Sequence, residues 1–232
     1  MTTEAFDISE TLATILDDET QGTEAFASAM SEAATELATR FVEEKECSGL
    51  TVVIVASAQD REFLRGFIKV LLDRKAKPSV STLWHKYRPQ TGFAVASSIL
   101  MAQHHEPHPP KADLVIYFTS SLAEDATIAD GLSRILSKIA ADETVIHTFT
   151  AAEAEVTSLR DQFEARNLAI PRILPLDGAI SPDEARGKSV RNALRSHLKQ
   201  AYGKRSIAYI PKALGGPDPI YKSDYGSRGP RI

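Results

Sequence analysis

The sequence predicts an α/β protein, a Rossmann-like three-layer domain with a mostly parallel sheet of about five strands. Apolar, β-branched segments alternate along the chain with segments whose apolar residues recur at helical spacing. The clearest strand, residues 50–57 (LTVVIVAS), is apolar almost throughout, as is typical of a parallel strand buried on both faces. At residues 112–128 a buried strand passes through a short polar loop into a helix, which is where open α/β sheets usually bind ligands.

The remaining elements follow from hydrophobic spacing and from start and stop signals. Two helices are expected at residues 7–18 and 24–45, before the first strand, and another at residues 60–75, after it. Further strands are expected at residues 80–85, 113–119, 144–149 and 170–176, with helices after the third and fourth strands. Pro171 and Pro175 place the last strand at an edge of the sheet. The final helix starts with Ser181-Pro182-Asp183-Glu184 and ends near Tyr202, before Gly203.

Charge divides the chain into three expected parts. Residues 1–48, an acidic helical N-terminal extension, hold 12 acidic and two basic side chains. Residues 49–203 are expected to form the α/β domain, and residues 204–232 form a basic tail rich in Gly, Pro and Tyr. Residues 186–232 hold 11 basic and two acidic side chains. Such asymmetry between the two ends indicates an interaction surface at one or both of them.

Composition is ordinary for a globular protein, with 43% hydrophobic and 25% charged residues and a net charge of −4. The apolar run at residues 93–102 is far shorter than the roughly 20 residues of a membrane-spanning helix. The acidic first residues do not resemble a secretory signal. Cys47 is the only cysteine, which excludes an internal disulfide, and its acidic neighbours predict an inert thiol. We therefore expect a cytoplasmic protein without membrane insertion.

Residues 50–150 resemble, in order and spacing, a degenerate type I phosphoribosyltransferase. Thr119 and Ser120 end the third strand at the place where that family carries two acidic residues. Residues 124–127 (EDAT) stand where the family has a Thr-Gly-x-Thr phosphate loop. Residues 84–89 (WHKYRP) end the second strand where the family often has a basic residue, and residues 90–111 then correspond to its flexible hood. The resemblance implies a ligand site at Thr119, Ser120, Ser121 and Thr127.

The motif that would catalyse phosphoribosyl transfer is not retained. Neutral Thr119 and Ser120 cannot replace the charges of the family's acidic pair. The loop has no glycine for close approach to a phosphate, and Glu124 and Asp125 place negative charge there instead. Acidic residues also stabilise the first turn of an ordinary helix, which is the simpler interpretation of both. We therefore predict no catalytic residues and no cofactor.

No metal site is predicted. The segment His104-His105-Glu106-Pro107-His108 is the one cluster of candidate ligands, but its prolines favour an extended, exposed loop and no second ligand group stands at recognisable spacing. Gly187-Lys188-Ser189 resembles the end of a P-loop but lies inside a helix and lacks the preceding glycine.

The final helix carries the clearest signal for a partner. Its basic residues form one stripe, while Val190, Leu194 and Leu198 lie on another face that should pack on the sheet. The predicted partner-binding residues are Lys188, Arg191, Arg195, Lys199, Lys204, Arg205, Tyr221, Tyr225 and Arg228. Such a stripe can be a solvated helix face, can dock on an acidic protein surface such as the chain's own first 48 residues, or can bind nucleic acid through phosphates and stacking.

These observations predict a non-catalytic α/β interaction or assembly subunit that contacts protein partners, or further copies of itself, through its charged ends. Two alternatives stay open. One is a phosphoribosyltransferase-like enzyme that handles a phosphosugar or nucleotide. The other is a nucleic-acid-binding protein that uses the basic C-terminal region.

Overall fold

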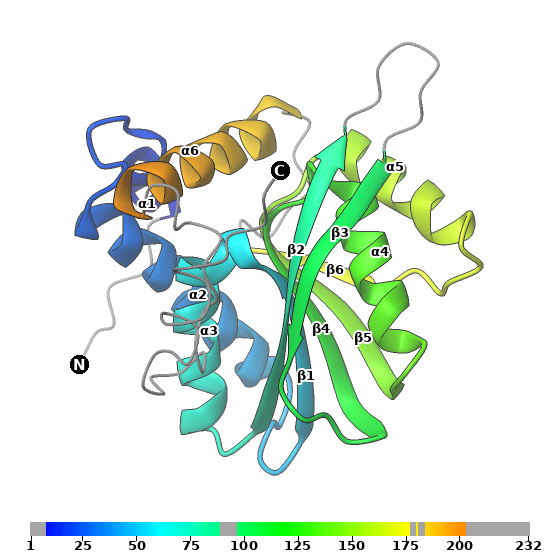
Figure 1. Ribbon diagram of the computed structural model, residues 1–232. Helices are drawn as coiled ribbons and strands as arrows, with labels where there is room; N and C mark the ends of the chain where they lie inside the picture. The colour runs from blue at the N-terminus through cyan, green and yellow to red at the C-terminus, as the bar shows by residue number, and fades with distance from the viewer. Residues whose placement is uncertain (1–7, 89–96, 177–179, 181–183, 203–232) are drawn as a thin grey trace, which may run out of the picture.

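The computed structural model describes residues 8–88, 97–176, 180 and 184–202 (Figure 1). The helices are α1 (Ile8–Leu16), α2 (Glu24–Glu44), α3 (Arg61–Asp73), α4 (Asp125–Leu136), α5 (Glu153–Glu164) and α6 (Glu184–Tyr202). The strands are β1 (Thr51–Ser57), β2 (Lys77–Arg88), β3 (Ser97–His105), β4 (Lys111–Ser121), β5 (Ala140–Thr150) and β6 (Arg172–Pro175). A short 3₁₀ turn, η1 (Ala58–Asp60), joins β1 to α3.

The described strands form one sheet in the order β3-β2-β1-β4-β5-β6, parallel except for the antiparallel pair β2–β3. The Rossmann-like α/β fold is therefore confirmed, and so is the edge position of β6. The six described strands fit the expected sheet of about five, and the additional strand, β3, lies within residues 90–111, where only a hood was expected. Along β3, apolar and polar residues do not alternate, because apolar residues lie on both faces of the strand. Ile99 and Met101 are exposed while Leu100 packs on the core, so the segment lacks the signature of a strand.

Helices cover both faces of the sheet (Figure 1). One core lies between the sheet and helices α1, α2, α3 and α6, and it contains Ile54 and Phe118. The other lies between the sheet and helices α4 and α5, and it contains Val55 and Tyr117. Neighbouring residues of one strand thus enter different cores, as the pleat of a strand requires.

Helix α2 is part of the main core and not a peripheral extension. Phe26, Met30 and Phe41 are buried in this core, and Phe41 contacts Phe67 of α3 and His147 of β5. The two helices approach closely at Gly66 of α3, where a Cβ atom would lie 2.0 Å from the Ser31 carbonyl oxygen. The acidic N-terminal region therefore buries apolar surface in the same core as the sheet. Each Å² of apolar surface buried stabilises the fold by about 25 cal/mol.

The structure also bears on the expectations for Cys47, for the final helix and for membrane-spanning segments. Burial raises the pKa of the Cys47 thiol, in line with the inert cysteine expected from the sequence. The end of α6 at Tyr202 agrees with the prediction, whereas its predicted start at residues 181–183 and the tail at residues 203–232 lie outside the described residues. None of the described helices combines the length and the apolar character needed to cross a membrane.

Candidate functional site

Two acidic residues begin the helices that follow the two central strands. Strand order reverses between β1 and β4, since β2 lies beside β1 on one side and β5 lies beside β4 on the other. In open α/β sheets, the carboxyl ends of strands at such a reversal form the usual ligand site. Asp60 stands at the N-cap position of α3, and Glu124 stands at the N-cap position of α4. We call this place, where β1 and β4 end, the carboxyl edge.

Neither carboxylate caps its own helix. Oδ1 of Asp60 instead accepts hydrogen bonds from the backbone N–H of Ser120 (2.9 Å), from Oγ of Ser120 (2.6 Å) and from Nη1 of Arg191 (3.1 Å). The side chains of Asp60 and Arg191 are 0% and 4% exposed, so this is a buried ion pair. Removing either partner would leave an uncompensated charge inside the protein.

Arg191 reaches this position from α6 and ties the end of β4 to it. Its Nη2 donates to Oγ1 of Thr119 at 2.7 Å and lies 3.4 Å from the carbonyl oxygen of Ser121. Burial by itself lowers the pKa of Arg191, but the nearby carboxylates of Asp60 and Glu124 outweigh it and raise this pKa. The guanidinium is therefore charged at neutral pH.

A second arginine of α6 pairs with the second carboxylate. Nη2 of Arg195 donates to Oε1 of Glu124, whose side chain is 7% exposed, while the Arg195 side chain is 46% exposed. The expectation that Glu124 only begins an ordinary helix is thereby corrected, because its carboxylate bonds across to α6. Together the four side chains place two positive and two negative charges at the carboxyl edge.

Gly187 lets α6 lie directly on the ends of the strands. A Cβ atom there would lie 2.4 Å from Oε1 of Glu155 and 3.0 Å from Oγ of Ser121. Glu155 itself begins α5, where its Oε2 accepts a hydrogen bond from the Ala152 N–H at 3.1 Å. A larger residue at position 187 would have to displace the Glu155 carboxylate or lift α6 from the carboxyl edge, so the resemblance to a P-loop at residues 187–189 reflects close helix packing.

The start of α4 offers no free cradle for a phosphate. The N–H of Ala123 donates to Oγ of Ser121 (3.1 Å), and the N–H of Ala126 donates to Oδ1 of Asp125 (2.7 Å). The N–H of Thr127 donates to the carbonyl oxygen of Glu124 (2.9 Å). These amides are therefore already satisfied within the chain, in contrast to a glycine-rich phosphate loop.

The predicted ligand residues divide into two groups. Thr119, Ser120 and Ser121 are buried together at the carboxyl edge. Thr127 is turned elsewhere, since its Oγ1 donates to Oγ of Ser98 in β3 at 3.2 Å. Sequence reasoning missed Asp60, although it stands just after the first strand as Ser120 stands just after predicted strand 113–119, and that equivalence was the available signal.

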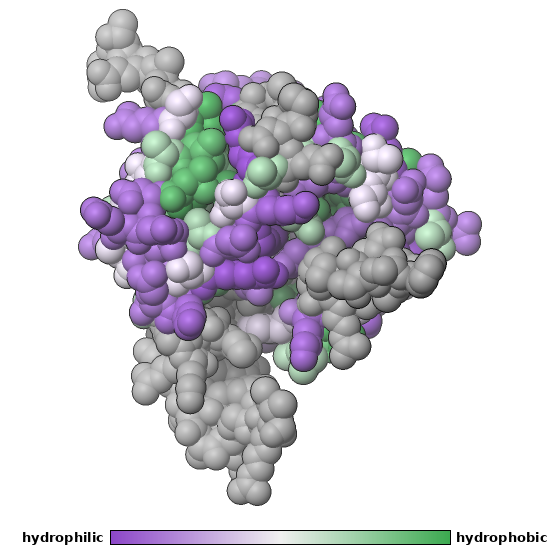
Figure 2. All heavy atoms as spheres, turned by 90° about the horizontal axis from the view of Figure 1, so that it is seen from above, coloured by the Kyte–Doolittle hydropathy of each residue, from purple (hydrophilic) through white to green (hydrophobic). Residues whose placement is uncertain are grey.

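The partner-binding prediction needs one correction. Arg191 is 3% exposed and ion-paired inside the protein, so it is not part of a surface stripe. Lys188, Arg195 and Lys199 are exposed on α6. Lys204, Arg205, Tyr221, Tyr225 and Arg228 lie outside the described residues. Figure 2 looks down on the end of the molecule that carries α6, and hydrophilic residues dominate the described surface there, with one hydrophobic area among them.

Metal ligands do not gather at this edge. Within residues 8–88, 97–176 and 184–202, no group of three or more His, Cys, Asp or Glu side chains is arranged to hold a metal ion. The histidines of residues 104–108 belong to the opposite end of the sheet, and their expected exposed loop is corrected: His104 and His105 end β3, and His105 and His108 are partly buried. Ligands at the carboxyl edge would meet arginine, carboxylate and hydroxyl groups.

The fold is that of a Rossmann-like α/β protein, with a buried polar cluster at the switch point, the place where strand order reverses. No protein-family model and no curated protein matches the chain. Among solved structures it is similar to the hypoxanthine-guanine phosphoribosyltransferase of L. donovani, with a TM-score of 0.42 and 9% identity over 64% of this chain and 82% of that one. The hypoxanthine-guanine phosphoribosyltransferase of Bacillus anthracis gives 0.41 and 16% over 68% and 80%. A hypoxanthine phosphoribosyltransferase of Staphylococcus aureus gives 0.39 and 12% over 64% and 74%. Likenesses this distant say nothing about the site, so we infer function from its side chains.

Proposed function

We propose that this protein binds a phosphosugar or nucleotide at the carboxyl edge, with guanidinium groups of α6 in place of a glycine-rich phosphate loop. The observation that carries the proposal is the position of the buried polar cluster. Asp60, Ser120 and Arg191 meet at the reversal of strand order, between two cores of apolar side chains. Guanidinium groups match the geometry of phosphate oxygens, which supports an anionic ligand.

Arg195 is the group that such a ligand would meet first. Its guanidinium is nearly half exposed, whereas Arg191 is enclosed. Glu124 is the partner of Arg195 in the free protein, and a phosphate would compete with that carboxylate. Arg191 would then act as a positioning residue, because it holds α6 on β4 through Thr119.

The proposal concerns binding and includes no transfer step. Phosphoribosyl transfer in the family that the sequence resembles relies on an acidic pair at the end of the strand. Here Thr119 and Ser120 carry no charge, and the carboxylate of Asp60 is neutralised by Arg191. These residues support recognition of a ligand better than they support its chemical conversion.

Thermal unfolding in the presence of ligands tests the proposal. A ligand that binds only the folded protein raises its melting temperature. We expect phosphoribosyl pyrophosphate or a nucleoside monophosphate, at millimolar concentration with magnesium, to stabilise the wild-type protein. Arg195→Met should weaken binding by about tenfold, which corresponds to the loss of one charge-assisted hydrogen bond.

Arg134→Met is the matched control. Arg134 is 44% exposed and pairs with Asp130 on α4, so it resembles Arg195 in exposure and in having a carboxylate partner. This variant should bind as the wild type does. An unchanged melting temperature of the wild type with every ligand, or equal weakening in both variants, would overturn the proposal.

A second candidate function is the contact with a protein partner or with further copies of the chain. Lys188, Arg195 and Lys199 project from the exposed side of α6, which supports a basic docking surface. The acidic first 48 residues supply a complementary charge. Light scattering at low and high salt, on the full chain and on a chain lacking residues 204–232, tests this candidate. A monomeric mass for each chain at both salt concentrations would contradict self-association.

A further inference from the structure

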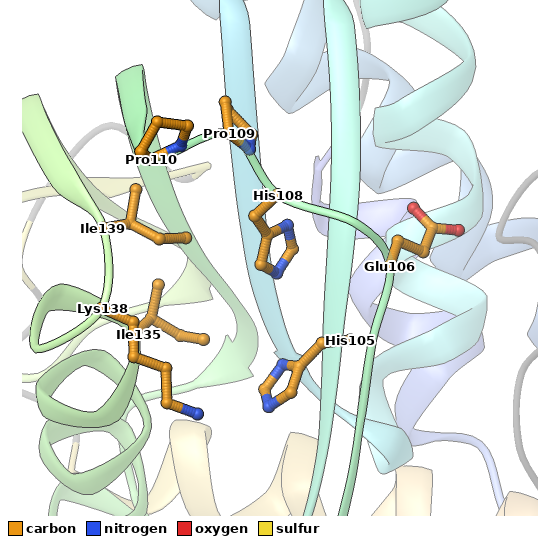
Figure 3. Close-up of a pocket in the computed structure, with 8 residues that line it drawn as sticks. All are labelled: His105, Glu106, His108, Pro109, Pro110, Ile135, Lys138 and Ile139. Atoms are coloured by element: carbon orange, nitrogen blue, oxygen red, sulfur yellow. The ribbon is translucent and has the colours of Figure 1, made fainter.

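A pocket of about 380 Å³ lies at the end of the sheet opposite to α6. Its walls come from the end of β3, from residues 106–110 and from the chain just beyond α4 (Figure 3). Pro109, Pro110, Ile135 and Ile139 supply its apolar lining, and His105, His108 and Lys138 supply its nitrogen atoms. A concave apolar site with a few convergent polar groups is the usual form of a small-molecule site.

A buried chain of hydrogen bonds holds the two imidazoles. Oγ of Ser81 lies 2.7 Å from Nδ1 of His105 and 2.6 Å from Nε2 of His108, and Oγ of Ser79 lies 2.9 Å from Nδ1 of His108. Ser81 is fully buried. A hydroxyl has one proton, so Ser81 donates to one ring and accepts from the other. The hydroxyls of Ser79 and Ser81 thereby fix the orientation of both imidazole rings.

The same chain leaves one polar atom of His105 for the pocket. Nε2 of His105 is buried and has no hydrogen-bond partner in the described part of the protein. When Nδ1 of His105 accepts the proton of Ser81, Nε2 carries the N–H of the neutral ring. Figure 3 shows the ring of His105 pointing toward Lys138 across the cavity. A bound acceptor between the two would satisfy this donor.

Charge in the pocket is one-sided. Lys138 is exposed and contributes an ammonium group. Burial lowers the pKa of His105 and of His108; Lys138 lowers the pKa of His105 further, and His105 and Lys138 lower that of His108. The carboxylate of Glu106 points away from the cavity (Figure 3) and accepts the N–H of Val80 at 2.8 Å.

We propose that this pocket binds a small organic carboxylate with a compact apolar body. Its carboxylate would lie between Nζ of Lys138 and Nε2 of His105, and its apolar part would pack on Ile135 and Ile139. This site is separate from the carboxyl edge and does not depend on the function proposed above. The class of ligand follows from the combination of a lysine, a buried N–H donor and an apolar wall.

Benzoate titrated into the full chain, with binding followed by calorimetry and by the NMR signals of the histidine rings, tests the proposal. We expect one site per chain and a shift of the His105 ring signals. Benzamide, which has the same shape without the charge, should bind at least about tenfold more weakly, as should benzoate to Lys138→Gln. Lys69→Gln, at an exposed lysine of α3, should leave the affinity unchanged.

Two results would overturn the proposal. One is the absence of any benzoate-dependent heat and of any shift at His105 at millimolar concentration. The other is equal affinity for Lys138→Gln and Lys69→Gln. His105→Gln provides an independent check, because it should weaken benzoate about tenfold while the melting temperature of the variant shows whether it is folded.

Discussion

Arg191 and Asp60 are 131 positions apart in the sequence, and Nη1 of Arg191 lies 3.1 and 3.3 Å from the two carboxylate oxygens of Asp60. The pair joins the last described helix to the turn that follows the first strand. The ion pair lies at the reversal of strand order, where ligands usually bind in sheets of this kind. Helix α6 of the same chain therefore covers this place. Stability and access to the carboxyl edge therefore depend on the same contacts.

Loss of the buried arginine should be costly. Arg191→Met leaves the Asp60 carboxylate buried without its counter-charge and should lower the free energy of unfolding by about 3–5 kcal/mol. Arg195→Met removes the half-exposed partner of the largely buried Glu124 carboxylate and should cost less, about 1–3 kcal/mol. Urea denaturation measures both. Equal losses in the two variants would contradict the buried ion pair.

Loss of the hydroxyl on Ser120 should also destabilise the protein. Ser120→Ala removes a buried donor 2.6 Å from Asp60, and the expected loss of unfolding free energy is about 1–3 kcal/mol. Ser137→Ala is the control, because that exposed hydroxyl donates only to the carbonyl oxygen of Arg134 among the described contacts. The denaturant midpoints of the two variants measure this difference, provided that the dependence of the unfolding free energy on denaturant concentration is unchanged. A Ser120→Ala protein as stable as the wild type would show that Asp60 is satisfied without this hydroxyl.

The close approach of α6 can be tested at Gly187. In an open helix, alanine is more favourable than glycine by about 1 kcal/mol. Here a Cβ atom would meet Oε1 of Glu155 at 2.4 Å, so Gly187→Ala should instead destabilise by about 1–3 kcal/mol. Ser189→Ala, on the exposed side of the same helix, should change stability by no more than about 0.5 kcal/mol. Thermal unfolding of both variants measures the difference, and a stabilising Gly187→Ala would mean that the Glu155 carboxylate yields to the added Cβ atom or that α6 lies farther from β4.

His147 should make the protein sensitive to acid. It is fully buried against Phe41 and Phe67, and burial, with a smaller effect of Arg172, lowers its pKa to about 3. In the unfolded chain its pKa is about 6.5, so below this pH the unfolded state binds a proton that the folded state excludes. This contribution to stability is complete above pH of about 6.5 and falls by about 1.4 kcal/mol per pH unit as the pH drops toward 3.

The variant His147→Phe isolates that proton. Between pH 6.5 and pH 3 its free energy of unfolding should fall less steeply than that of the wild type. The difference in slope should correspond to one proton, or about 1.4 kcal/mol per pH unit. Denaturation at a series of pH values measures the slopes. Parallel curves for wild type and His147→Phe would show that His147 is accessible to protons in the folded state.

The sequence by itself determined the alternation of strands and helices, the edge position of β6 and the apolar face of α6. These features follow from local hydrophobic spacing and from proline, which act within a few residues. It also marked residues 119–121 as the end of a central strand. It did not reveal β3, because Ile99 and Met101 of that strand face solvent while Leu100 packs on the core, so the apolar residues follow no single face.

Only the tertiary structure decided what each charged side chain does. Helical spacing predicted that Arg191 would share a surface stripe with Lys188 and Arg195, but a buried carboxylate after β1 draws Arg191 inward. Asp60 and Glu124 both stand where a cap is expected, yet their partners come from α6, which lies far away in the chain. These ion pairs form between groups that the packing of the core brings together from distant parts of the chain, so no local sequence pattern predicts them.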